Sequence, residues 1–195
     1  VGVFCQHEKA LEVLSGIGCK VEQGNRVKIP AHLVEAAIES SPSSIDVYDR
    51  EGALRMTLAG RNVYFGAGLT CPHLVEIDGM RRPYTLGDCA RQSRIAEALA
   101  NIDFTMAMGH TSDVRVEIRD VCEVWTVMKN STKPAIVTSH TAESLRTMVE
   151  ICGVLSGSEE AFLARPYLLY YTEPVSPLQH TTHSLDKVFA AADYG

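Results

Sequence analysis

Two histidines and a glutamate follow apolar segments of this 195-residue chain, at points where each segment gives way to polar residues. "IDFTMAMGH" ends at His110, "KPAIVTSH" ends at His140, and "YLLYYTEP" passes through Tyr171 to Glu173, with Ser176 shortly after. Nearly continuous apolar runs are typical of strands buried on both faces of a parallel sheet. Functional side chains of such proteins lie at the carboxyl ends of the strands. We therefore predict a substrate-binding site formed by Glu173, Tyr171, His110, His140 and Ser176.

The residue types at these strand ends suit the binding of a cation more than nucleophilic catalysis. A carboxylate at the end of an apolar strand must be paired, solvated or available to a cation. An aromatic ring beside Glu173 would strengthen the binding of an ammonium group. Ser139 and His140 are adjacent and would point to opposite faces of a strand, so a nucleophile–base pair is rejected. For His110 and His140, a hydrogen bond to loop backbone is an equally good interpretation, and no catalytic residue is assigned.

Helical and strand patterns alternate from Thr85 onward in repeats of roughly 30 residues, as βαβ units require. Helices are predicted over 85–102, 113–130 and 141–157 with Thr85, Ser112 and Thr141 as N-caps, strands over 102–110, 133–140 and 166–174, and a last helix capped by Thr182. A doubly wound open sheet and a (β/α)8 TIM barrel both fit this order. The glycines of "GAGLTCPH" precede another extended stretch rather than a helix, which disfavours a dinucleotide site. We predict an α/β fold of the (β/α)8 TIM-barrel type.

The first part of the chain has a different character. A helix over 6–14, a hairpin around Gly24-Asn25 and a helix over 30–42 are followed by alternating segments with a tight turn at Asp78-Gly79. We predict two regions: 1–84, an amino-terminal helix and β-hairpin region, and 85–195, the first βα units of the barrel. Because a barrel needs eight strands, we expect the chain to be the amino-terminal part of a longer protein.

Composition narrows the class of protein. The net charge is −6 and no lysine or arginine run occurs, so broad electrostatic binding to nucleic acid is not expected. Apolar runs stay well below the roughly 18 residues that span a bilayer, and no signal-peptide pattern begins the chain. The protein is predicted to be cytoplasmic with no membrane partner. Six widely spaced cysteines form no C-x-x-C pair, and we predict no metal site.

Several motifs in one order carry a family resemblance. "HEKALEVLSGIGCKVEQGNRVKIPAHLVEAAIESSPSSIDVYDR" is followed by "VYFGAG", "EIDGMRRPYTLGDCARQSRIAEALANIDF", "SDV", "NSTKP" and "EPVSPL". Together they resemble the amino-terminal part of the trimethylamine methyltransferase family, which includes glycine betaine methyltransferase-like members. The resemblance implies a barrel of more than twice this length that moves a methyl group from a methylated amine to the cobalt of a partner corrinoid protein. It implies no directly bound cofactor, a role in one-carbon metabolism such as methanogenesis, and possible homo-oligomers.

Other functions stay open at this stage. A different TIM-barrel enzyme, a metal-dependent hydrolase or lyase, could use His110, His140 and Glu173 as ligands. A non-catalytic truncated barrel is a third hypothesis. The position of pyrrolysine in some family members would lie beyond Gly195. If that residue is absent, the resemblance implies a quaternary amine such as a betaine rather than trimethylamine.

Overall fold

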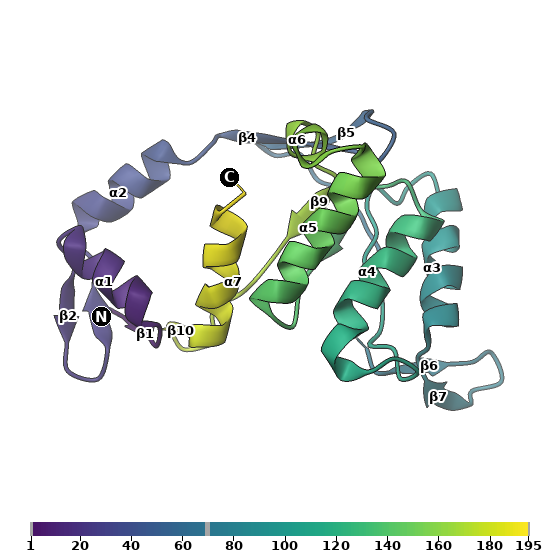
Figure 1. Ribbon diagram of the computed structural model, residues 1–195, viewed down its shortest axis with the longest axis horizontal. Coiled ribbons are helices and arrows are strands. Elements are labelled where there is room, and N and C mark those ends of the chain that lie inside the picture. Colours follow the sequence, from purple (N-terminus) through teal and green to yellow (C-terminus); the bar gives the residue numbers. More distant parts are fainter. Residues whose placement is uncertain (1, 69–70, 195) are drawn as a thin grey trace. The chain divides into compact units, whose positions relative to one another are not determined.

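The computed structural model describes residues 2–68 and 71–194, which form two compact units (Figure 1). The terminal unit combines residues 2–43 with 172–194, and the central unit comprises residues 44–171. Both units mix helices and strands, so the chain has a mixed α/β fold. The sequence-based division into 1–84 and 85–195 marks where the βα alternation begins, and it stays a prediction.

The terminal unit joins the two ends of the chain through a small sheet. Its strands have the order β10-β1-β3-β2, in which β1 pairs parallel to β10 and antiparallel to β3. The elements are β1 (Val3–Cys5), α1 (Glu8–Gly16), β2 (Lys20–Glu22), β3 (Arg26–Lys28), α2 (Ala31–Ser40), β10 (Gln179–His180) and α7 (Thr182–Ala192). The predicted first helix, hairpin and second helix are confirmed, with Gly24 and Asn25 at positive φ in the turn.

The central unit contains two hairpins and a pair of parallel strands. Its elements are β4 (Ser44–Tyr48), β5 (Leu54–Ala59), β6 (His73–Val75), β7 (Arg81–Pro83), α3 (Leu86–Ala98), the 3-10 helix η1 (Val116–Ile118), α4 (Arg119–Asn130), β8 (Ala135–Val137), α5 (Ala142–Ser156), α6 (Glu159–Ala164) and β9 (Leu168–Tyr170). β4 pairs with β5 and β6 with β7, both antiparallel, while β8 and β9 run parallel with α5 and α6 between them. No helix of the described ranges is long and apolar enough to cross a membrane.

The strand predicted over 102–110 is reduced to isolated bridges. Thr105 pairs in parallel with Ala135 of β8, and further parallel bridges join Phe104 to Gly66 and Gly109 to Cys71. The Gln92 side chain, from α3, also bonds the backbone of this segment. Its Nε2 donates to the Met106 carbonyl at 3.1 Å, and its Oε1 accepts from the Met108 amide at 3.3 Å. These bonds give two backbone groups of the segment a side-chain partner.

Helix caps are confirmed at two predicted sites and differ at two others. Thr85 caps α3 in a full capping box with Asp88, and Thr141 caps α5. Ser112 does not cap a helix: its Oγ donates to the Tyr84 carbonyl at 3.0 Å, and η1 precedes α4 instead. Thr181 rather than Thr182 caps α7, because the Thr181 hydroxyl accepts from the Ser184 amide.

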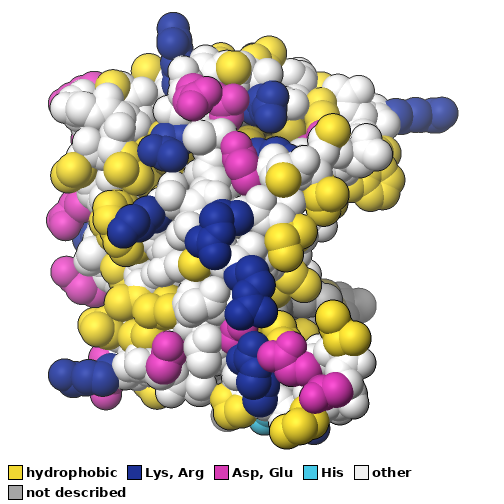
Figure 2. Space-filling view, turned by 90° about the vertical axis from the view of Figure 1, so that its right-hand side faces the viewer, with side chains coloured by type: hydrophobic (Ala, Val, Ile, Leu, Met, Phe, Trp, Pro, Cys, Tyr) yellow, Lys and Arg dark blue, Asp and Glu magenta, His cyan; other side chains and the backbone are white. Residues whose placement is uncertain are grey.

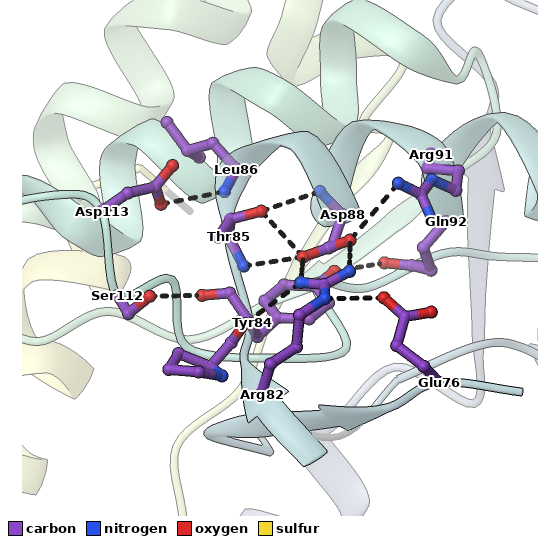
Figure 3. A network of polar contacts seen from close by, with 11 residues as sticks. Glu76, Arg82, Tyr84, Thr85, Leu86, Asp88, Arg91, Gln92, Ser112 and Asp113 are labelled. Carbon is purple, nitrogen blue, oxygen red and sulfur yellow. Dashed lines mark hydrogen bonds and ion pairs between the residues drawn. The ribbon is translucent and has the colours of Figure 1, made fainter. Parts of the chain in front are cut away.

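An ion-pair network fastens the β6–β7 hairpin to the start of α3 (Figure 3). Arg82 donates two hydrogen bonds to the Asp88 carboxylate, at 2.6 and 2.8 Å, and a third to Glu76 at 2.6 Å. Asp113 accepts from the Leu86 amide at 3.0 Å, which ties the segment after His110 to the same helix end. The hairpin, α3 and the loop after residue 109 are therefore held together.

The "NSTKP" motif fixes the entry to β8. Lys133 is buried, and its Nζ donates to the Ala96 and Leu99 carbonyls at 2.7 Å each, where α3 ends. Burial lowers the pKa of this lysine. Glu97 accepts from the Ser131 hydroxyl at 2.6 Å. The motif thus supplies partners for the end of one helix just before the next strand begins.

The surface that includes α3 has mixed polarity. Figure 2 shows a row of lysine and arginine side chains bordered by acidic and hydrophobic ones. On α3, Arg91 lies 3.7 Å from Asp88 and Arg94 donates to the Asn130 side chain at 2.8 Å. Both arginines of α3 therefore have a local partner.

Candidate functional site

A cavity of about 240 Å³ lies at the carboxyl end of β8, within the central unit. Residues from 106–110, η1–α4 and 136–140 line it, and they include both His110 and His140. Much of the wall is apolar, with Val124, Val127 and Ile136 among its side chains. His110 and His140, which were predicted because they follow strand segments, therefore line the same cavity.

Glu123 places a buried carboxylate in this wall. Only 4% of the residue is exposed. Its Oε1 accepts from the Thr111 amide at 2.7 Å and from the Thr111 hydroxyl at 3.1 Å, and its Oε2 lies 3.8 Å from His110 Nδ1. Burial raises the pKa of Glu123, although the bonds from Thr111 and a charge on His110 act in the opposite direction. A nearby cation would favour its ionised form.

The first turn of α4 adds two charged side chains to the cavity. Asp120 Oδ2 accepts from the His140 amide at 2.6 Å, which fixes the loop after β8. Arg119 also lines the cavity, and its Nε is buried without a hydrogen-bond partner among the described residues. Arg119 and Glu123 are four positions apart, so they lie on the same face of the helix. The cavity thus combines carboxylates and an arginine donor with apolar walls.

Tyr170, the last residue of β9, and Tyr171, which follows it, have different environments. The Tyr170 hydroxyl lies 2.9 Å from Ser139 Oγ, which in turn donates to the Thr141 carbonyl at 2.7 Å. Burial raises the pKa of Tyr170. Tyr171 is 38% exposed, and its amide donates to the Val137 carbonyl at 3.0 Å. The alternation expected of a strand is therefore present at its end.

The other predicted site residues lie outside the lining of this cavity. Tyr171 is the last residue of the central unit, whereas Glu173 and Ser176 belong to the terminal unit and are exposed. The Glu173 carbonyl accepts from the Ser184 hydroxyl at 3.1 Å. Substrate binding by Glu173, Tyr171, His110, His140 and Ser176 stays a prediction.

Sequence reasoning missed the three charged residues of α4 at this cavity. The helical pattern of α4 contains Arg119, Asp120 and Glu123, and a search restricted to strand ends does not consider helical residues. A signal was present, since Glu123 shares the buried face of the helix with Val124 and Val127. A carboxylate on the apolar face of an amphipathic helix indicates a partner or a ligand.

The described residues hold no group of three His, Cys, Asp or Glu side chains placed to bind a metal ion. His110 and Glu123 come together as a pair without a third such ligand.

The chain is a mixed α/β protein with parallel βα units. Its cavity at the end of β8 has mostly apolar walls that also contain two carboxylates. The family model for trimethylamine methyltransferase (MTTB) matches residues 1–195, and the chain belongs to that family. It is 28% identical over 196 residues to glycine betaine methyltransferase of Desulfitobacterium hafniense strain Y51, covering all of this chain and 41% of that protein.

Two further relatives agree with this assignment. Trimethylamine methyltransferase MttB of Desulfitobacterium hafniense strain DSM 10664 is 25% identical over 200 residues, covering all of this chain and 40% of that protein. MttB1 of Methanosarcina mazei is 25% identical over 206 residues, covering all of this chain and 41% of that protein. The chain therefore spans about two fifths of the length of these curated relatives.

Proposed function

We propose that the protein containing this chain transfers a methyl group from a small methylated ammonium compound to the cobalt of a corrinoid carried by a partner protein. The observation that carries the proposal is the buried Glu123 carboxylate in an apolar cavity of a trimethylamine methyltransferase family chain. The reduced cobalt of the partner's corrinoid would supply the nucleophile; the N–CH3 bond would break as a Co–CH3 bond forms, and the demethylated amine would leave with the electron pair. The protein itself then needs to bind the cation, orient one N–CH3 bond and exclude water.

The side chains of the cavity suit these tasks. A methylated ammonium group has an apolar surface that matches walls such as Val124 and Val127, and a positive charge that matches Glu123. A carboxylate attracts such a cation by charge alone, and the low polarity of the surroundings strengthens that attraction. Because burial raises the pKa of Glu123, cation binding is expected to strengthen as pH rises and the carboxyl group ionises.

Arg119 favours a betaine over trimethylamine as the substrate. Its Nε is a buried donor without a hydrogen-bond partner among residues 2–68 and 71–194, on the same cavity as Glu123. A betaine carries both a quaternary ammonium and a carboxylate, so the two ends of the molecule match Glu123 and Arg119. Trimethylamine offers no group that would accept from the arginine. The name of one relative, glycine betaine methyltransferase, agrees with this preference.

The proposed architecture is a (β/α)8 barrel of which this chain forms the first units. The parallel pairing of β8 with β9 and the bridge between Thr105 and Ala135 support it, because barrel strands are all parallel. The cavity lies at the carboxyl end of β8, where barrel enzymes bind substrates. The corrinoid of a partner protein would approach this same end.

The test is a methyl-transfer assay with the full-length protein, its corrinoid protein, and a panel of trimethylamine, glycine betaine and other betaines. Glu123→Gln should lower kcat/KM at least tenfold, because the ammonium group of the substrate loses the carboxylate charge that faces it. A tenfold loss corresponds to about 1.4 kcal/mol of transition-state stabilisation. Glu117→Gln is the matched control, because Glu117 precedes α4 and its side chain is 70% exposed. No methylation of the corrinoid by any compound would refute the proposal.

A further inference from the structure

A second hollow lies at the amino ends of β8 and β9, at the end of these strands opposite to the first cavity. The turn that follows β4 crosses this end: the Tyr48 amide donates to the Pro166 carbonyl at 2.9 Å and the Arg50 amide to the Thr132 carbonyl at 2.8 Å. Thr132 and Pro166 precede β8 and β9, respectively. The hollow measures about 360 Å³ and is lined by 49–52, by the end of α5 and by 161–167.

Two arginines line this hollow without a bonded carboxylate. Arg50 has a buried Nε that finds no hydrogen-bond partner in the described ranges. The guanidinium of Arg165 lies against Gly52, where an added Cβ would come 3.2 Å from its NH1 atom. Among residues 2–68 and 71–194, neither guanidinium is within ion-pair distance of an acid. A buried donor without a partner, such as the Arg50 Nε, is unfavourable unless a ligand satisfies it.

The acidic side chains beside the hollow either have other partners or are exposed to solvent. Asp49 Oδ1 accepts from the Glu51 and Ala53 amides, at 3.0 and 2.9 Å, and Oδ2 lies 3.6 Å from Arg55. Glu51 is exposed to solvent. The charge that Arg50 and Arg165 bring to the hollow is therefore left without a direct counterion from this turn.

The opposite wall contains a hydrogen-bonded tyrosine, Tyr167. The Tyr167 hydroxyl donates to the Cys152 carbonyl at 3.0 Å and lies 3.1 Å from Ser156 Oγ. Burial raises the pKa of Tyr167 to about 12, while the positive charge of Arg50 acts in the opposite direction.

We propose that this hollow binds a small oxyanion, a phosphate or carboxylate group, between Arg50 and Arg165. Guanidinium groups bind such anions through paired N–H donors, and the buried Arg50 Nε supplies one that the protein itself does not use. The bound anion would join the turn after β4 to the segment between α6 and β9. The proposal is independent of methyl transfer, because the two cavities share no lining residue.

The experiment titrates the full-length protein with sodium phosphate, and separately with sodium succinate, at constant ionic strength set by chloride. Isothermal calorimetry measures affinity, and the thermal midpoint provides a second readout. Saturable binding of either anion is expected, and the tighter one identifies the ligand chemistry. Arg165→Ala should weaken binding at least tenfold, whereas Arg61→Ala, an exposed arginine of the same unit, should leave it unchanged.

Failure would be clear from the same measurements. The proposal is overturned if neither anion binds saturably to the full-length protein, or if Arg165→Ala binds as tightly as the unchanged protein. Arg165 is exposed, so its replacement should leave the fold intact even where Arg50→Ala does not. Methyl-transfer activity of Arg165→Ala should stay at the level of the unchanged protein, which separates this site from the proposed reaction.

Discussion

Replacing Asp88 with alanine should destabilise the central unit by about 3 kcal/mol. Asp88 is 3% exposed and accepts from Arg82 at 2.6 and 2.8 Å. It also accepts from the Thr85 hydroxyl at 2.7 Å and amide at 3.1 Å. Breaking a buried ion pair costs about 3–5 kcal/mol. The lower end applies, because Arg82 is 33% exposed and keeps its bond to Glu76.

The effect of Asp88 should depend on pH in a defined direction. The Arg82 guanidinium, and then Thr85, hold the pKa of this carboxyl well below its usual range. Its folded-state pKa is therefore below the unfolded value of about 4. The stabilisation is fully present above pH 4 and is lost as pH falls through the folded pKa. The difference between the protein and its Asp88→Ala variant should shrink steadily below pH 4.

Urea unfolding followed by the fluorescence of Trp125 measures this effect. Trp125 is the single tryptophan and lies on α4 in the same unit. Arg82→Ala should also destabilise, whereas Arg81→Ala is the matched control, because the Arg81 side chain contacts His73 at an exposed edge. A loss below about 0.5 kcal/mol for Asp88→Ala at pH 7, or a difference that does not shrink in acid, would refute the reasoning.

Three further changes test other parts of the central unit. Lys133→Met should cost about 2 kcal/mol in urea unfolding and speed amide exchange at the end of α3, because two carbonyls lose their donor. Gly109→Ala should destabilise by about 1–3 kcal/mol, since the added methyl would overlap the Tyr84 ring. Glu123→Gln should gain stability relative to the unchanged protein as pH rises from 4 to 8, because a raised folded-state pKa means stability lost on ionisation. Equal pH profiles of these two proteins would contradict that role for burial.

Local signals in the sequence were sufficient for two of the four predicted caps and for one tight turn. Thr85 with Asp88 three residues later specifies a capping box through a few neighbouring atoms, and Asp78-Gly79 specifies its turn in the same way. The strand over 102–110 was predicted from its apolar run, whereas the described residues show isolated bridges there and two bonds from the Gln92 side chain of another element. A side-chain contact from another element leaves no periodic pattern in the sequence.

The candidate site was predictable only in part. Strand ends in a parallel sheet gather at one edge, which is why His110 and His140 were expected and found at one cavity. Glu123 reaches the cavity from the side of a helix, so its role depends on how α4 packs. The pairing of Phe4 with Gln179 was also missed, since strands of two or three residues show no alternation.

The discontinuity of the terminal unit has a consequence for synthesis. The central unit is continuous in sequence, so it can finish folding on the ribosome while residues 2–43 lack their partner strand. At 5–20 residues per second, Gln179 emerges on the order of ten seconds after the first hairpin. During that interval β1 presents an unpaired edge to chaperones and to other nascent chains. The pairing of β1 with β10 therefore depends on the rate at which residues 29–180 are translated.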